Sequence, residues 1–340
     1  MKNSKFKIKN KIVSEKSKTF IISEIGINHE GNFHKCIKMI DESKKSGADA
    51  VKLQTALASN NYVKNSQSFK EFKKTDFSVE ELLKLVNYSK KRKLIFISTP
   101  GSFPEVDMLF KCKVDGMKIS SGSMTNYPLI TYASRKAKAL IISTGMAYEN
   151  EIFQALKASR SNKNVAILKC TSLYPPNDNE LNLDSIKTYI KKFKKNIIGY
   201  SDHKRDFLSC LIAVNNGAKI IEKHFTLDSK KAGKDHHISL EPKIFKNMVE
   251  QIRRVESISG KSDIFPSNKE IYNRKLFHRC IVAARDIKKG EKFSKENLAL
   301  KRVNKKNDYG IEPKYLQKLL NKKSLKKISK NKSIKKTFFD

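Results

Sequence analysis

The sequence predicts a (β/α)8 TIM barrel followed by a small C-terminal module, and two observations support this fold class. From residue 19 to residue 224, short apolar runs alternate with amphipathic segments, which is typical of buried parallel strands and their crossover helices. Beyond residue 277 the pattern changes to short strands and tight turns. We therefore assign 1–260 to the barrel, 261–276 to a linker and 277–340 to the module. A doubly wound open sheet is the alternative, but no GxGxxG fingerprint follows the first run.

Each barrel element follows from a local signal. The expected strands are 19–25, 50–54, 93–99, 116–120, 139–144, 165–170 and the two runs that end near Ser201 and His224. The expected helices are 32–46, 79–91, 106–110, 128–136, 149–159, 183–193, 207–215 and 241–259. Ser78 and Glu81 predict a capping box, and Pro242 suits a first helical turn. Residues 1–18 are polar and rich in Lys, and the segment between 55 and 78 is predicted to be a polar loop.

The C-terminal module is predicted from weaker signals. Strands are expected at 280–284 and 298–302, with a short helix that begins at Ser294. The segment 287–291 is echoed by 328–332, with Asn331 in the place of Gly290. Because Asn tolerates the left-handed conformation that Gly supplies, both segments are expected to form the same turn.

Composition argues against several classes of function. The formal charge of +37 comes from 71 Lys and Arg against 34 Asp and Glu, mostly Lys spread along the chain, which we interpret as a composition bias rather than a nucleic-acid-binding surface. The five cysteines form no C-x-x-C pair, so a reducing cytoplasm without disulfides is expected. Residues 1–18 lack the apolar core of a signal peptide, and no apolar run approaches the roughly 18 residues of a membrane span.

Two histidines close apolar runs that should be neighbouring strands. His203 ends the segment 199–203 (GYSDH), and His224 ends 222–224 (EKH). Ligand sites of parallel α/β proteins lie at the carboxyl ends of the strands. Either histidine alone would more often be a capping or core residue, but the pair favours two ligands of one metal ion.

Polar residues also end the other predicted strands. Lys52 and Lys118 lie between apolar neighbours, and hydroxyl groups at Thr99, Ser121 and Ser143 complete a pocket suited to a doubly charged phosphate. A metal at the histidine pair would polarise a carbonyl group. The combination suggests carbon–carbon bond formation between a phosphorylated enol and an aldehyde.

These motifs together resemble the sialic acid synthase family. The matching segments are 23–31 (SEIGINHEG), 47–55 (GADAVKLQT), 118–122 (KISSG), 126–129 (NYPL), 143–146 (STGM), 199–203, 222–226 (EKHFT) and 235–242 (DHHISLEP). Residues 281–290 (IVAARDIKKG) resemble the antifreeze-like SAF module, of β-clip fold, that this family carries. The match runs in the expected order from about residue 20 onward, which makes it far more specific than any single motif.

The resemblance implies a reaction. The family condenses phosphoenolpyruvate with an open-chain N-acylated hexosamine, such as N-acetylmannosamine or a diacetamido-hexose, to give a nine-carbon sialic-type acid and phosphate. His203 and His224 would hold Mn²⁺ or Mg²⁺. Phosphoenolpyruvate would contact Lys52, Lys118, Thr99, Ser121, Ser143 and Ser201. The sugar would contact Gln54, Tyr174 and Asp235, with Ser172 as a further substrate-binding residue and Glu24 near the reacting centre.

The resemblance also implies an assembly. The family forms a domain-swapped homodimer in which the C-terminal module covers the barrel mouth of the partner. Arg302 matches the arginine that reaches the partner's sugar. No nucleic acid or membrane is expected among the partners.

The chain departs from the family pattern at several positions. Ser123 stands where an acidic residue usually helps to position water, and Gly101 follows Pro100 where Phe is common. Lys169 occupies a position that is often His, and Val303-Asn304 replaces the usual Pro-Gly after Arg302. A catalytically impaired, sugar-binding relative is therefore the alternative to an active synthase. Nucleic-acid binding rests on charge alone, and a metal-dependent hydrolase would need Asp202 as its carboxylate.

Overall fold

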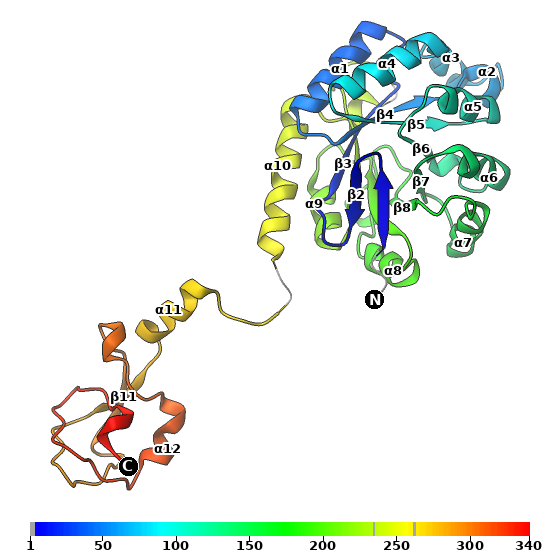
Figure 1. Cartoon of the computed structure of the whole chain (residues 1–340). Coiled ribbons are helices and arrows are strands. Elements are labelled where there is room, and N and C mark those ends of the chain that lie inside the picture. Colours follow the sequence, from blue (N-terminus) through cyan, green and yellow to red (C-terminus); the bar gives the residue numbers. More distant parts are fainter. Residues whose placement is uncertain (1–3, 234, 261–262) are drawn as a thin grey trace. The chain divides into compact units, whose positions relative to one another are not determined.

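The computed structural model describes residues 4–233, 235–260 and 263–340, which form two compact units (Figure 1). The first unit is Met1–Gly260 and the second is Lys261–Asp340. Residues 1–3 of the predicted barrel range and residues 261 and 262 of the predicted linker lie outside the described residues.

The first unit is a closed parallel barrel of eight strands, which confirms the predicted fold class. Its strands are β3 (Phe20–Gly26), β4 (Ala50–Thr55), β5 (Ile95–Pro100), β6 (Gly116–Ile119), β7 (Leu140–Ser143), β8 (Val165–Cys170), β9 (Ile197–Asp202) and β10 (Ile220–His224). They pair in chain order, and β10 closes the ring by pairing with β3. Each strand coincides with one of the predicted apolar runs to within two residues at either end.

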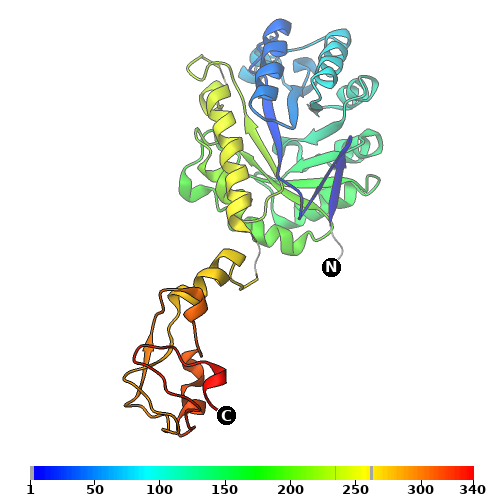
Figure 2. The ribbon, with the colours of Figure 1, turned by 60° about the vertical axis from the view of Figure 1, so that its left-hand side comes forward.

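Helices cover the outside of the barrel (Figures 1 and 2). They are α1 (Phe33–Lys45), α4 (Val79–Lys91), α5 (Phe103–Lys111), α6 (Tyr127–Lys136), α7 (Glu149–Ala158), α8 (Ser185–Lys192), α9 (Leu208–Asn215) and α10 (Pro242–Ser259). The predicted capping box at the start of α4 is present, and Pro242 lies in the first turn of α10. None of the helices in the described ranges combines the length and the apolar character that a bilayer crossing requires.

Alternation along the strands separates two apolar layers. Outward side chains such as Val51 and Ile221 pack against the helices, while inward side chains such as Ile22, Ala50 and Ile220 fill the barrel. Side chains two residues apart share a face of a strand. The next inward positions toward the carboxyl ends are therefore Glu24, Lys52 and Glu222, so the inner face changes from apolar to charged where the strands end.

A short hairpin packs against the opposite end of the barrel, in a segment for which the sequence indicates only a polar, Lys-rich composition. It consists of β1 (Lys5–Ile8) and β2 (Lys11–Ser14). Phe6, Ile8 and Val13 are buried against the first inward residues of the strands. The abundant lysines obscure the alternation of Phe6 and Ile8 with Lys, which is the period of a half-buried strand.

The segment between β4 and α4, predicted to be a polar loop, contains two short helices. These are α2 (Ala58–Asn61) and α3 (Gln67–Phe72). Phe72 is buried against Ile27 and Ala58, which anchors the loop over the strand ends. Short 3₁₀ turns occur at Ser121–Ser123, Asp178–Glu180, His236–Ile238, Lys306–Asp308, Pro313–Tyr315 and Lys336–Phe338.

The second unit has its own core around an antiparallel strand pair. β11 (Cys280–Ala283) pairs with β12 (Leu298–Lys301), and α12 (Leu316–Leu319) is its second helix. Ile287 and Ile328 form an isolated bridge, and Gly290 and Asn331 have φ of +83° and +65°. The prediction of two matching turns is confirmed.

One prediction in this unit needs correction. The helix expected from Ser294 is a turn, because the Asn297 side chain accepts from the Ser294 N–H and donates to the Lys292 carbonyl, which replaces helical hydrogen bonds. The expected linker contains helix α11 (Asn268–Phe277), which begins with a capping box between Ser267 and Glu270. That capping signal is readable in the sequence.

Candidate active site

A cavity of about 490 Å³ opens at the carboxyl ends of the barrel strands. Every barrel residue predicted to bind substrate or metal lines it, with the exception of Asp235. These residues are Glu24, Lys52, Gln54, Thr99, Lys118, Ser121, Ser143, Ser172, Tyr174, Ser201, His203 and His224. The fold therefore brings together residues from all eight strands, as expected from the closed ring.

Two lysines and two glutamates form a buried charge cluster on the cavity floor. Lys52 Nζ lies 2.8 Å from Glu24 Oε2 and 3.7 Å from Glu222 Oε1, and Lys118 Nζ lies 2.5 Å from Glu222 Oε1. All four side chains are at most 6% exposed. Lys52 also donates to Thr99 Oγ1 at 3.2 Å. The lysines are thus held at fixed positions and face the cavity.

The two carboxyl groups of this cluster differ in their protonation. Burial raises the pKa of Glu24 above its ordinary value, and the nearby Lys52 only partly offsets that effect. Burial acts in the same sense on Glu222, but Lys118 and Lys52 together hold the pKa of Glu222 below its ordinary value. Glu24 is the carboxyl group that more readily carries a proton, and Glu222 is the anchoring carboxylate.

Several buried polar atoms of the cavity have no hydrogen-bond partner among the described residues. Apart from Glu24 Oε2, which is ion-paired with Lys52, they are Ser143 Oγ, Ser172 Oγ, Glu222 Oε2 and His224 Nδ1. Buried polar groups in proteins are almost always paired, because an unpaired group loses its hydration without compensation. Four such atoms around one cavity indicate that a polar ligand completes their bonding.

The histidine pair is arranged to accept a metal ion. The His203 and His224 ring centroids are 5.4 Å apart, and Tyr174 stacks on His203 at 4.0 Å. His203 Nδ1 lies 2.8 Å from the Thr171 carbonyl oxygen, which only accepts, so Nδ1 donates there and Nε2 is the nitrogen left for a metal. Burial lowers the pKa of His203, but its contacts with Cys170 and Thr171 raise it overall, so a metal at Nε2 competes with a proton. Burial lowers the pKa of His224 well below its ordinary value, which favours the neutral, ligating form.

The residues present therefore fit a divalent ion held by two imidazoles. Within the described ranges, no cluster of three or more His, Cys, Asp or Glu has metal-binding geometry. A metal at the pair would thus take its remaining ligands from substrate and water, which is the open arrangement of catalytic rather than structural sites.

Asp235 lies beside the cavity, with Oδ2 at 3.8 Å from His224 Nδ1. Its loop is bound to the loop after β3. Ser239 Oγ donates to the Asp235 carbonyl at 2.6 Å, and Asn28 Nδ2 donates to Ser239 Oγ at 2.9 Å and to the Phe225 carbonyl at 3.0 Å. The two Asn28 hydrogen bonds join residues more than 190 positions apart in the chain, so sequence reasoning did not find them.

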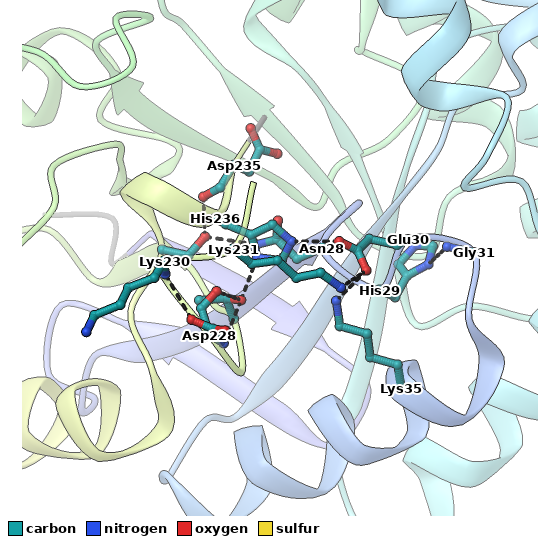
Figure 3. Close-up of polar contacts among 12 residues, drawn as sticks. Asn28, His29, Glu30, Gly31, Lys35, Asp228, Lys230, Lys231, Asp235 and His236 are labelled. Atoms are coloured by element: carbon teal, nitrogen blue, oxygen red, sulfur yellow. Dashed lines mark hydrogen bonds and ion pairs between the residues drawn. The ribbon is translucent and has the colours of Figure 1, made fainter. Parts of the chain in front are cut away.

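A second connection between the same loops is centred on Glu30 (Figure 3). Its carboxylate accepts from Lys35 at 3.0 Å and from Lys231 at 2.5 Å, and it lies 3.3 Å from His236 Nε2. These partners lower the pKa of Glu30 to about 2 although partial burial acts in the opposite sense. The carboxylate therefore stays charged and keeps the Asp235 loop against the barrel at neutral pH.

Asp202, the carboxylate that a hydrolase would need, faces away from the cavity. Its Oδ2 lies 2.5 Å from Lys223 Nζ, and its Oδ1 accepts from Tyr200 and Ser209, both at 2.7 Å. Asp202 and Lys223 are both fully buried. Asp202 is therefore committed to an internal ion pair, and the hydrolase alternative loses its base.

Sequence reasoning assigned no role to several residues that line the cavity, and one of the residues that it did assign, Arg302, is not part of the barrel. Glu222 was not assigned a role, although it stands two residues before His224 and shares its inward face. Asn61, Tyr62, Phe72, Gly101, Ser120, Met146 and Cys170 also line the cavity, together with Ser123. Arg302 belongs to the second unit, where its guanidinium lies 6.0 Å from the centre of the Phe277 ring.

Comparison with known proteins reveals extensive similarity over both units. Residues 39–263 match the NeuB family and residues 278–339 match the SAF domain. An uncharacterised protein of Methanocaldococcus jannaschii is 40% identical, over 94% of each chain. The N,N'-diacetyllegionaminic acid synthase of Campylobacter jejuni is 36% identical, over 84% of this chain and 90% of its own length.

A solved structure extends this similarity to three dimensions. The N-acetylneuraminic acid synthetase of Leptospira borgpetersenii, in complex with citrate, has a TM-score of 0.76 and 32% identity, over 81% of this chain and 98% of its own. The extent of these matches exceeds what a shared barrel architecture alone would produce. The chain therefore belongs to the NeuB family, whose named relatives here are acid synthases, and it carries an SAF domain after its barrel.

Proposed function

We propose that this protein condenses phosphoenolpyruvate with an open-chain N-acylated hexosamine to give a sialic-type nine-carbon acid and phosphate. The observation that carries the proposal is the cavity floor, where buried Lys52 and Lys118 lie beside serine hydroxyl groups that lack partners. The names of the relatives, which are legionaminic and sialic acid synthases, support the same reaction.

We assign the phosphate-binding role to the two lysines and the surrounding hydroxyl groups. Lys52 and Lys118 supply fixed positive charge, and Thr99, Ser121 and Ser143 donate hydrogen bonds to oxygen atoms of phosphoenolpyruvate. Ser201 Oγ donates to Glu222 Oε1 at 3.0 Å and would turn to phosphoenolpyruvate when it binds. Glu24 and Glu222 hold the two ammonium groups in place, Glu24 at Lys52 and Glu222 at both lysines. Because the lysines are already ordered, little side-chain entropy is lost when the phosphate binds.

The sugar is assigned to the side of the cavity that contains Gln54, Ser172, Tyr174 and Asp235. Gln54 Nε2 donates to Glu24 Oε1 at 3.1 Å, so the amide and the carboxyl group are oriented together. The raised pKa of Glu24 allows it to carry a proton close to the reacting carbonyl group. Ser123 has no acidic group, so this assignment makes Glu24 the proton carrier of the site.

The proposal includes a divalent ion, Mn²⁺ or Mg²⁺, held by His203 and His224. Such an ion supplies Lewis-acid polarisation of the sugar aldehyde. The protein's own contribution is to fix the imidazoles: the Thr171 carbonyl sets the tautomer of His203, and Tyr174 stacks against its ring.

Two finer points belong to the proposal. The sugar is N-acetylmannosamine or a diacetamido-hexose, the second being the kind of precursor that the name of the Campylobacter relative implies. The active form is a domain-swapped homodimer in which Arg302 of one protomer reaches the sugar of the other. Sedimentation of the full chain checks the oligomeric state, and a monomer that turns over at full rate would contradict the swap.

The deciding experiment measures phosphate release from phosphoenolpyruvate with Mn²⁺ across a panel of N-acylated mannose-type sugars, with and without a chelator. We expect sugar-dependent release that the chelator abolishes. Sugar binding without release would instead favour the second candidate, a catalytically impaired relative, which the presence of Ser123 in the cavity suggests. Ser123→Glu would then be the variant to test for restored turnover.

A further inference from the structure

The cavity wall formed by the loops after β4 and β5 contains a close approach between Gly101 and Asn61. A Cβ atom built on Gly101 would lie 1.9 Å from Asn61 Oδ1 and 2.7 Å from Asn61 Cγ. Both residues line the cavity. The Asn61 amide therefore occupies space that any side chain at position 101 would fill, and the glycine is what admits it.

Hydrogen bonds fix the orientation of this amide. Asn61 Nδ2 lies 2.9 Å from the Leu57 carbonyl oxygen and 2.6 Å from Glu105 Oε1. Both partners are acceptors only, so the NH₂ group must face them and the oxygen must face Gly101. Among the hydrogen bonds of the described residues, Oδ1 takes part in none, which leaves it as an acceptor for a ligand.

Glu105 makes this arrangement rigid. It is fully buried, and its carboxylate accepts from the backbone N–H of Leu57 at 2.8 Å, of Gly101 at 2.6 Å and of Ser102 at 2.8 Å, besides the Asn61 amide. One carboxylate thus joins the loop after β4 to the loop after β5. Rotating Asn61 would remove one of its charge-assisted hydrogen bonds, so the acceptor is held before any ligand arrives.

We propose that Asn61 is a specificity-determining residue for the sugar, whose hydroxyl or acylamino N–H group donates to the Asn61 amide oxygen. This inference rests on the proposed synthase function. A carbonyl-type oxygen attracts neutral donors and repels phosphate and carboxylate oxygens, which assigns Asn61 to the sugar rather than to phosphoenolpyruvate. Strands β4 and β5 pair with neither β9 nor β10 in the ring, so Asn61 and the histidine pair approach the cavity from different sides of the barrel.

The test compares Asn61→Ala, Gly101→Ala and the double variant in the phosphate-release assay. Asn61→Ala should raise the KM for the sugar about tenfold, the loss expected for one hydrogen bond, and leave the KM for phosphoenolpyruvate unchanged. Gly101→Ala should do the same, because its Cβ displaces the amide. The double variant should be no worse than Asn61→Ala, because the added methyl group then enters vacated space. Asn60→Ala, an exposed neighbour in α2, is the matched control and should match the wild type.

Sugar analogues identify the group that is recognised. An analogue that lacks the recognised hydroxyl or acylamino group should lose about tenfold in kcat/KM with the wild type and nothing further with Asn61→Ala. A purely structural role would instead lower stability and affect all sugars and phosphoenolpyruvate alike. Thermal unfolding of each variant separates the two, and Asn61→Ser replaces Asn61→Ala if the latter does not fold.

The outcomes distinguish this inference from the proposed function. Wild-type turnover with an unchanged sugar KM in Asn61→Ala overturns the inference and leaves the synthase intact. Multiplicative losses in the double variant also overturn it. If the wild type releases no phosphate, the synthase proposal fails, and calorimetric titration of the sugars into the Mn²⁺-loaded protein decides the inference. Weaker binding to Asn61→Ala supports the inference, and equal or absent binding refutes it.

Discussion

Strands β9 and β10 carry polar residues on both faces at their carboxyl ends, and the two faces are built differently. On the outer face, Asp202 and Lys223 form a fully buried ion pair in which both carboxylate oxygens have partners, from Lys223, Tyr200 and Ser209. On the inner face, Glu222 and His224 are equally buried, yet Glu222 Oε2 and His224 Nδ1 lack hydrogen-bond partners among the described residues. The two pairs of side chains are both buried, and they differ in whether all their polar atoms have hydrogen-bond or ion-pair partners.

This difference separates structure from function at adjacent positions of one chain. A buried polar group that is fully paired stabilises one packing arrangement, whereas an unpaired one costs free energy unless a ligand completes it. The outer pair therefore belongs to the framework that holds the strand ends in register, and the inner residues are held ready for a substrate or a metal. Substitutions on the two faces should give opposite patterns of stability and turnover.

His224→Ala is the strongest test of the inner face. We expect turnover to fall by about 10³-fold or more, equivalent to roughly 4 kcal/mol, because the substrate carbonyl loses its metal. The free energy of unfolding should change by less than about 1 kcal/mol, since Nδ1 makes no hydrogen bond. His203→Ala should also abolish turnover. The phosphate-release assay measures turnover, calorimetric titration measures the loss of Mn²⁺ binding, and urea denaturation measures the free energy of unfolding. Near-normal activity in either variant would falsify the shared-metal assignment.

Lys223→Met, at the position next to His224, should instead cause a large loss of stability. It leaves the Asp202 carboxylate buried without its counter-ion, which should cost about 3–5 kcal/mol of unfolding free energy. The double variant Asp202→Leu/Lys223→Met removes both charges and should recover much of that loss. Denaturant titration measures both values. If Lys223→Met were as stable as the wild type, the outer pair would not be part of the framework.

The sequence predicts those features of the fold and the site that depend on residues close together in the chain. Alternating apolar runs place eight strands, and residues at their ends, such as Lys52 and His203, fall on the inner face because strand periodicity is fixed. The role of Asp202 was not predictable in this way. It looks like a candidate base next to His203, and only the strand pairing that puts Lys223 opposite it shows that it is already neutralised.

The remaining site features depend on contacts between distant segments. Asn61 faces the cavity because Gly101, forty residues later, has no side chain, and because Glu105 fixes the amide. Asp235 is positioned by Asn28 through Ser239. Neither relationship has a spacing or a motif that marks it. The hairpin that contains Phe6 was missed for a different reason, since abundant lysine conceals its alternating pattern.

Ser143→Ala tests the inner face with a smaller change. Its hydroxyl group is buried without a partner, so removing it should leave stability unchanged or raise it by up to about 1 kcal/mol. The KM for phosphoenolpyruvate should rise about tenfold, the loss of one hydrogen bond to an anionic group. Ser134→Ala is the control, because Ser134 is also buried but donates to the Thr131 carbonyl, away from the cavity. A stability loss in Ser143→Ala larger than in the control would contradict the ligand role of this hydroxyl.

Arg302→Ala tests a residue that belongs neither to the buried ion pair of the barrel nor to the cavity lining, because it lies in the second unit. Arg302 is exposed in the second unit, so its removal should change unfolding free energy by no more than about 0.5 kcal/mol. In the swapped dimer, the KM for the sugar should rise about fivefold, since one charge-assisted contact is lost, while the KM for phosphoenolpyruvate stays constant. Lys301→Ala, the exposed neighbour on β12, is the matched control for loss of charge. An equal effect on both substrates, or the same effect in Lys301→Ala, would show that the module acts through general electrostatic attraction and not through contact with the sugar.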